Sequence, residues 1–150
     1  MLEPALFRHD RVPGHVLHFA LRVIAVDIQE KMLRGLQKRL KKSGLADRVN
    51  TRLALPDSLG LQDLKGQVDF VLAYAVVHEM PSSRAFFEQS AAAARPGARL
   101  LLVEPTGHVK TEEFEAELKD AAEAGFRLIE RPKLGRGLTA LLEKKPTLSS

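Results

Sequence analysis

Side chains that could bind or activate a ligand stand at the ends of three apolar runs in this sequence. Asp27 follows RVIAV, His78 and Glu79 follow VDFVLAYAVV, and Glu104 follows RLLLV. An imidazole titrates near neutral pH and a carboxylate accepts hydrogen bonds from hydroxyl groups, so these residue types suit acid–base chemistry and sugar binding. Parallel strands bring their carboxyl ends to one edge of a sheet, where open α/β sheets bind ligands. The spacing therefore predicts one site built from three distant segments.

The first half of the chain predicts strands that alternate with a helix. Residues 22–26 are rich in β-branched side chains, and the apolar residues that follow recur at helical spacing: Ile28, Met32, Leu36 and Leu40. Gly44 comes directly after a lysine-rich stretch, a composition typical of a helix end. Residues 49–53 predict a further strand, and the continuous apolar run over residues 68–77 predicts a strand buried on both faces.

The second half continues this alternation. A helix is expected after its N-cap Ser82, and a buried strand over residues 99–103. Another helix is expected over residues 111–124, and its apolar stripe predicts core packing: Phe114, Leu118 and Ala121. Residues 126–130 and 138–143 predict two last strands. Only RPKLGRG separates them, which is too short for a parallel crossover, so this pair is expected to be antiparallel.

This order of elements predicts an α/β fold. Long helices between strands favour parallel pairing through right-handed crossovers. We therefore expect a Rossmann-like, doubly wound and mostly parallel sheet with an antiparallel C-terminal strand. At 150 residues one hydrophobic core suffices, so residues 1–150 are expected to form a single domain, with an atypical N-terminal segment (1–21) and a frayed tail (145–150).

Composition excludes several functional classes. The chain has no cysteine, which excludes disulfides and thiolate metal sites and fits the cytoplasm. No apolar run is long enough to span a membrane, and no signal peptide is expected. The net charge of +4 comes from dispersed basic residues, and one Tyr with no Trp gives little material for base stacking, so nucleic-acid binding is not favoured. His9, Asp10, His15 and His18 have no second ligand cluster, so no metal site is predicted.

Three motifs in the expected order resemble class I S-adenosylmethionine-dependent methyltransferases, in particular the small-molecule type 11 and type 12 members. RVIAVDIQEKML is similar to the family's second strand and the helix after it, VDFVLAYAVVHEMPSSRAFF to the fourth strand and its loop, and ARPGARLLLVEP to the fifth strand. The resemblance implies S-adenosylmethionine as the cofactor and a small molecule as the methyl acceptor. It runs from about Arg22 to Lys144.

The resemblance also implies roles for individual residues. Asp27, with Ile28 beside it, matches the acid that binds the ribose hydroxyls, and Asp57 lies where the family contacts adenine. Ala73 and Tyr74 match the strand end that lines the methionine part of the cofactor, and His78 is the candidate catalytic residue. Structural roles stay open for four of them: a helix N-cap for Asp27, a turn for Asp57, a half-buried ring for Tyr74, and a structural or substrate-lining role for His78.

The sequence departs from the family at its N-terminus. The glycine-rich loop that holds the cofactor in the family has no counterpart, because Gly14 is the only glycine before Arg22. The first strand and its helix are therefore expected to be missing or altered. We expect either direct pairing of residues 22–26 with residues 68–77 or a homodimer that completes the sheet. Two functions follow: a methyltransferase that acts on a small molecule, whose cofactor binding the missing loop could impair, or a non-catalytic, truncated or degenerate relative that acts through oligomers or partners. A nicotinamide-dependent dehydrogenase, which also needs a glycine-rich fingerprint, ranks last.

Overall fold

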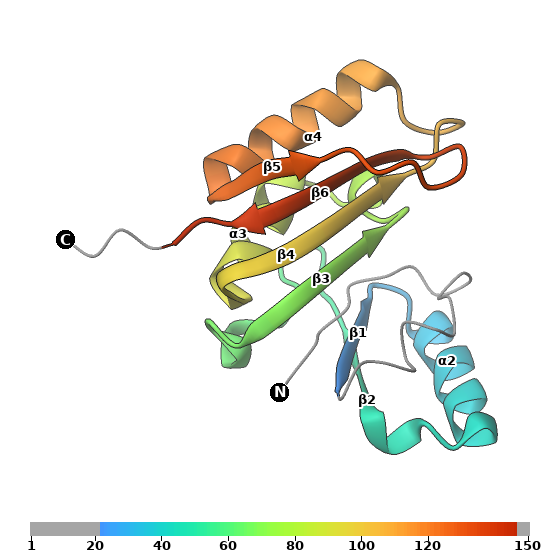
Figure 1. Cartoon of the computed structure of the whole chain (residues 1–150). Coiled ribbons are helices and arrows are strands. Elements are labelled where there is room, and N and C mark those ends of the chain that lie inside the picture. Colours follow the sequence, from blue (N-terminus) through green and yellow to red (C-terminus); the bar gives the residue numbers. More distant parts are fainter. Residues whose placement is uncertain (1–21, 147–150) are drawn as a thin grey trace.

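The computed structural model describes residues 22–146 (Figure 1). The predictions for residues 1–21, which include the four candidate metal ligands, and for residues 147–150 lie outside this part. The strands are β1 (Val23–Asp27), β2 (Val49–Leu53), β3 (Val68–Tyr74), β4 (Ala94–Glu104), β5 (Phe126–Glu130) and β6 (Leu138–Lys144). The α-helices are α2 (Glu30–Ser43), α3 (Ser83–Ala93) and α4 (Thr111–Ala124), and a short 3-10 turn, η4 (Val77–Glu79), links β3 to α3.

The strands form two sheets within the described residues. β1 pairs with β2 in parallel, and a second sheet has the order β3-β4-β6-β5. β3 and β4 are parallel, whereas β6 runs antiparallel to both β4 and β5. The mostly parallel arrangement with an antiparallel C-terminal strand confirms the predicted fold class.

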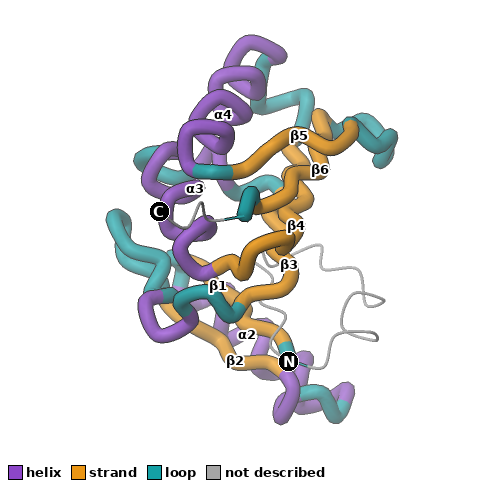
Figure 2. The backbone as a smooth tube through the Cα atoms, turned by 60° about the vertical axis from the view of Figure 1, so that its left-hand side comes forward, coloured by secondary structure: helices purple, strands orange, loops and turns teal. Residues whose placement is uncertain are grey.

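Helices cover both faces of the strands, because alternate side chains of β1 and β3 enter different apolar clusters. One cluster joins strand residues to α3 and α4: Ile24, Val26, Val71, Ala73, Phe86, Phe87 and Phe114. The other joins the opposite faces of the same strands to α2: Val23, Ala25, Leu36, Leu40 and Leu72. Figure 2 shows α3 and α4 together on one side of the larger sheet. This packing is that of a doubly wound fold.

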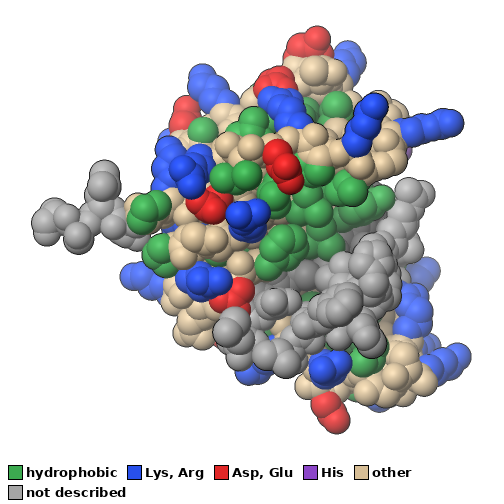
Figure 3. Space-filling model, viewed as in Figure 1, with side chains coloured by type: hydrophobic (Ala, Val, Ile, Leu, Met, Phe, Trp, Pro, Cys, Tyr) green, Lys and Arg blue, Asp and Glu red, His purple; other side chains and the backbone are tan. Residues whose placement is uncertain are grey.

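Residues 22–146 cover the face of the larger sheet turned away from α3 and α4 only in part. Hydrophobic side chains gather at the surface there (Figure 3). Phe70, Leu101 and Leu141 are accordingly half-buried rather than buried.

Local sequence signals placed the helix ends well. Gly44 ends α2 in the left-handed conformation at φ 71°, and Gly125 ends α4 at φ 111°. The hydroxyl of Ser82 accepts a hydrogen bond from the backbone N–H of Ala85 at 3.1 Å, so Ser82 is the N-cap of α3, as predicted. Ile28 is a correction: it precedes α2 and is 45% exposed, so it does not belong to the buried helix stripe.

The predicted strand over residues 68–77 is too long. β3 ends at Tyr74, Ala75 takes φ 52°, and Val77 begins η4. The apolar run continues beyond the strand because Val77 is buried in the core without extended backbone. An apolar residue type therefore does not distinguish a residue in a buried strand from a residue that is buried in a turn.

The expected direct pairing of residues 22–26 with residues 68–77 is also wrong. β1 and β3 belong to different sheets, with no ladder between them. Val23 and Ala25 instead share the apolar cluster of Leu72 beneath α2, so side-chain packing links the two strands. Among residues 22–146, no helix has both the length and the apolar character that crossing a membrane requires.

Candidate functional site

Asp27 ends β1 and shapes the turn into α2. Its Oδ1 accepts a hydrogen bond from the backbone N–H of Gln29 at 2.8 Å. The N-cap of α2 is Gln29. Asp27 is therefore not the N-cap, but its side chain accepts a hydrogen bond from the N-cap residue. A carboxylate has about four lone-pair positions, so this single bond leaves capacity for hydroxyl donors from a ligand.

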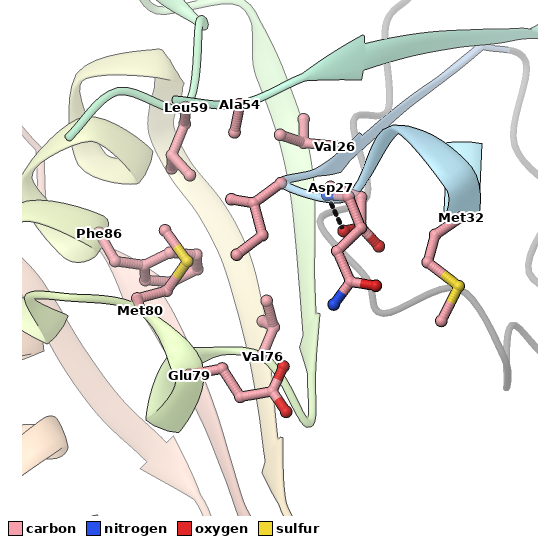
Figure 4. Close-up of a pocket in the computed structure, with 11 residues that line it drawn as sticks. Val26, Asp27, Met32, Ala54, Leu59, Val76, Glu79, Met80 and Phe86 are labelled. Carbon is pink, nitrogen blue, oxygen red and sulfur yellow. Dashed lines mark hydrogen bonds between the residues drawn. The ribbon is translucent and has the colours of Figure 1, made fainter. Parts of the chain in front are cut away.

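A small apolar hollow lies beside Asp27, where the ends of β1 and β2 approach η4 (Figure 4). Ala54, Leu59, Met80 and Phe86 form much of its wall. Its volume is about 30 Å³. A cavity needs roughly 10 to 15 Å³ for one water molecule, so this space admits about two. The hollow is apolar enough for a flat ring but too small for one in this conformation.

His78 and Glu104 form a buried pair where β3 and β4 end. A carboxylate oxygen of Glu104 is hydrogen-bonded to Nδ1 of His78, and its other oxygen accepts the backbone N–H of Val77 at 3.0 Å. Glu104 is fully buried and the His78 side chain is 17% exposed. Burial raises the pKa of Glu104, and the neighbouring imidazole opposes that rise. A carboxylate that binds Nδ1 fixes the ring and leaves Nε2 to exchange a proton.

The imidazole of His78 has further neighbours on its outer side. Nε2 lies 3.9 Å from Oε1 of Glu79. The ring of His108, from the loop after β4, stacks on it with centroids 6.1 Å apart and planes 16° apart. His78 therefore stands between a buried carboxylate, Glu104, and a partly exposed one, Glu79.

Ala75 follows β3 in a conformation that non-glycine residues rarely adopt. Its φ is 52°, and its N–H donates to the carbonyl of Val103 at 2.7 Å. Such backbone strain clusters at functional sites. Tyr74 and Ala75 line a second hollow of about 230 Å³, which the β5–β6 loop closes on its other side at Arg136.

The structure brings some predicted residues together and separates others. Asp27 and Ile28 both line the small apolar hollow, and Tyr74 lines the second hollow. Ala73 is fully buried in the core. Asp57 is exposed on the turn between β2 and η3 (Gln62–Leu64) and does not line the apolar hollow, where Ala54 and Leu59 stand instead.

Glu117 of α4 is a functional candidate that the sequence did not suggest. It is 6% exposed, and its Oε2 has no hydrogen-bond partner among the described residues. Burial, together with the negative charges of Glu104, Glu113 and Asp120, raises its pKa to about 8. The available signal was its spacing: Glu117 lies three residues after Phe114 and four before Ala121, on the buried stripe of the helix.

Comparison with known proteins places this arrangement in a family. Residues 11–102, more than half of the chain, match the family model described as a methyltransferase domain. No curated protein sequence matches the chain.

Several solved structures share the fold. A SAM-dependent methyltransferase from Aquifex aeolicus is 21% identical with a TM-score of 0.71, over 95% of this chain and 81% of that one. Geranyl diphosphate methyltransferase in complex with SAM is 13% identical with a TM-score of 0.71, over 97% and 79%. The [4+2]-cyclase SpnF is 13% identical with a TM-score of 0.77, over 97% and 76%. Fold alone therefore does not fix the reaction.

The family match and the strand order agree with the motifs seen in the sequence. The family match covers the β1 segment and almost all of β4. The cofactor of this family is S-adenosylmethionine. Asp27, Tyr74 and Glu104 lie at the carboxyl ends of parallel strands, which is where open α/β folds bind ligands. The chain belongs to the class I S-adenosylmethionine-dependent methyltransferases.

Proposed function

We propose that this protein transfers a methyl group from S-adenosylmethionine to a small molecule. The observation that carries the proposal is the family match, together with the positions of Asp27 and the His78–Glu104 pair at or just after the carboxyl ends of parallel strands. One of these groups suits a nucleoside and the other suits proton transfer. A non-catalytic relative of the fold is not favoured by the family match.

The residues at this edge fit the nucleoside half of the cofactor. Asp27 would accept the ribose hydroxyls, and Ala54, Leu59 and Phe86 would contact the adenine ring. The hollow of about 30 Å³ must widen for that ring. Met32 and Met80 line it, and methionine side chains are flexible enough to move aside. When bound, the cofactor supplies an electrophilic methyl group.

The methionine half of the cofactor has less support from the sequence. The family holds it with a glycine-rich loop, and this chain has only Gly14 before Arg22. We therefore expect weaker cofactor binding than in relatives that have the loop. Ala75 follows β3 with a φ of 52° and lines the second hollow, so its backbone is a place where this part of the ligand could bind.

His78 is proposed as the residue that removes a proton from the methyl acceptor. Glu104 holds Nδ1, which orients the ring and leaves Nε2 available. The acceptor would give its proton to Nε2, and the imidazolium would be stabilised by the buried carboxylate. This hydrogen bond to Glu104 is the observation that favours a role in proton transfer for His78.

Methyl transfer tests this function. The wild-type protein should form S-adenosylhomocysteine when S-adenosylmethionine is incubated with a panel of small amines, alcohols and thiols. His78→Ala should reduce turnover while leaving cofactor affinity unchanged. No turnover with any acceptor, although the cofactor binds, would count against the proposal.

Assembly into a homodimer is a further part of the proposal. Within residues 22–146, β1 pairs only with β2 and β3 only with β4, so each keeps one edge without a backbone partner. Exposed strand edges favour pairing with another chain. Light scattering at micromolar concentration should give twice the mass of the chain, and a concentration-independent monomer would contradict this part.

A further inference from the structure

A third hollow lies on the helix side of the His78–Glu104 pair and belongs to neither hollow described above. It has a volume of about 370 Å³ and opens between η4, the loop after β4 and the first half of α4. Its polar lining consists of two glutamates, two histidines and one serine: His78, Ser83, His108, Glu113 and Glu117. No Lys or Arg is among the described residues that line it.

The buried carboxyl group of Glu117 is the feature that calls for a ligand. The residue is 6% exposed and lines the hollow, yet its Oε2 is without a hydrogen-bond partner among the described residues. Leaving a buried polar group unpaired is costly, so native proteins rarely keep one without a role. A ligand that donates hydrogen bonds would supply the missing partner.

The charges around Glu117 select the sign of that ligand. Glu104, Glu113 and Asp120 all disfavour its negative form. Asp120 is hydrogen-bonded to the hydroxyl of Ser83, and Glu104 to the imidazole of His78, so neither of these partners brings a fixed positive charge. The guanidinium of Arg84, which also interacts with Asp120, is exposed and pairs with Glu88 and Glu123. A cation in the hollow would offset the repulsion among these carboxylates, whereas an anion would add to it.

The remaining lining selects the shape of the ligand. Val77, Met80, Val109 and Ala116 give the hollow an apolar wall next to its carboxyl groups. Hydrocarbon contacts that wall favourably, and an ammonium group has three N–H donors for the carboxylates. An aliphatic amine has both a hydrocarbon chain for the apolar wall and an ammonium group for the carboxylates.

We propose that the hollow lined by His78, Glu113 and Glu117 binds an aliphatic ammonium ion, with Glu117 as its anchoring carboxylate. The cation binds the ionised form of Glu117, so binding at neutral pH releases the proton that this carboxyl group otherwise keeps. The site needs no S-adenosylmethionine, so its failure would leave the proposed methyl transfer untouched.

The experiment is an NMR titration of the full chain with n-butylammonium chloride at pH 7 and pH 9, without cofactor. With a pKa of about 8, Glu117 is ionised in about one molecule in eleven at pH 7 and about ten in eleven at pH 9. Affinity should therefore rise about tenfold. An alkylammonium ion resembles the lysine side chain, whose pKa is about 10.4, so it stays charged at both pH values.

Matched variants and a neutral probe complete the test. Glu117→Gln should lose at least about tenfold in affinity and all of the pH dependence, since a neutral amide cannot pair with the cation. Glu112→Gln removes an exposed carboxylate from the same helix and should bind like the wild type. Equal binding of n-butanol, an affinity that does not change with pH in the wild type, or full binding by Glu117→Gln would each overturn the proposal.

Discussion

Replacing Glu117 with Gln should change how the stability of the protein depends on pH. The side chain keeps its size, but the variant can no longer ionise at this position. Glu117 has a pKa of about 8 in the folded protein, against 4.5 for an exposed glutamate. The unfolded chain therefore releases this proton at lower pH than the folded protein does.

The magnitude follows from the gap between these two pKa values. The gap of about 3.5 corresponds to roughly 5 kcal/mol, at about 1.4 kcal/mol for each pKa unit. Between about pH 4.5 and pH 8 the folded state binds more protons than the unfolded state, so the free energy of unfolding of the wild type falls as pH rises. The Gln variant lacks this decline. Its buried amide costs about 1 to 3 kcal/mol at every pH if its N–H groups stay unpaired.

The assay is urea unfolding of both proteins at pH values between about 4 and 8. Glu117→Gln should be less stable than the wild type near pH 4 and more stable near pH 8, with the difference between them shifting by up to about 5 kcal/mol. Glu112→Gln should show no such trend, because Glu112 is exposed. A difference between Glu117→Gln and the wild type that stays constant across this pH range would refute the reasoning.

Four further substitutions test other parts of the structure. Glu104→Ala should cost about 3 to 5 kcal/mol of stability because it leaves the N–H of Val77 and the ring of His78 without their acceptor. His78→Ala should lower methyl transfer more than the melting temperature, and equal losses in both assays would favour a structural role for His78. Ser82→Ala should lower the free energy of unfolding by about 1 kcal/mol through loss of the α3 cap, with cofactor affinity unchanged in a binding titration. Ala75→Gly should cost less than the usual roughly 0.5 to 1 kcal/mol of an alanine-to-glycine change, because glycine tolerates φ 52°; a full loss on denaturant unfolding would argue against strain there.

The sequence predicted the elements of the fold because each has a local signal. Helix ends at Gly44 and Gly125 and the cap at Ser82 depend on nearby backbone geometry, which residue type largely determines. The antiparallel pairing of β5 and β6 followed from the short segment between them.

Features that depend on the tertiary structure were harder to predict. The end of β3 was missed because Val77 is buried for packing, not for strand pairing. Glu117 was not singled out in the sequence, since charged residues are seldom buried without a partner. His78 and Glu104 were both candidates in the sequence, but their direct contact joins residues 26 positions apart and needed the structure.

The most direct test of the central claim is a calorimetric titration with S-adenosylmethionine. The wild type should bind one cofactor per chain, and Asp27→Ala should bind it about ten to a hundredfold more weakly, since hydrogen bonds to a charged group contribute roughly 1.5 to 3 kcal/mol. Asp27→Asn keeps an acceptor for the Gln29 N–H and separates support of the turn from cofactor binding, and Asp47→Ala is the control for an exposed aspartate. Absence of binding at millimolar cofactor, or equal affinity in the wild type and Asp27→Ala, would contradict the account.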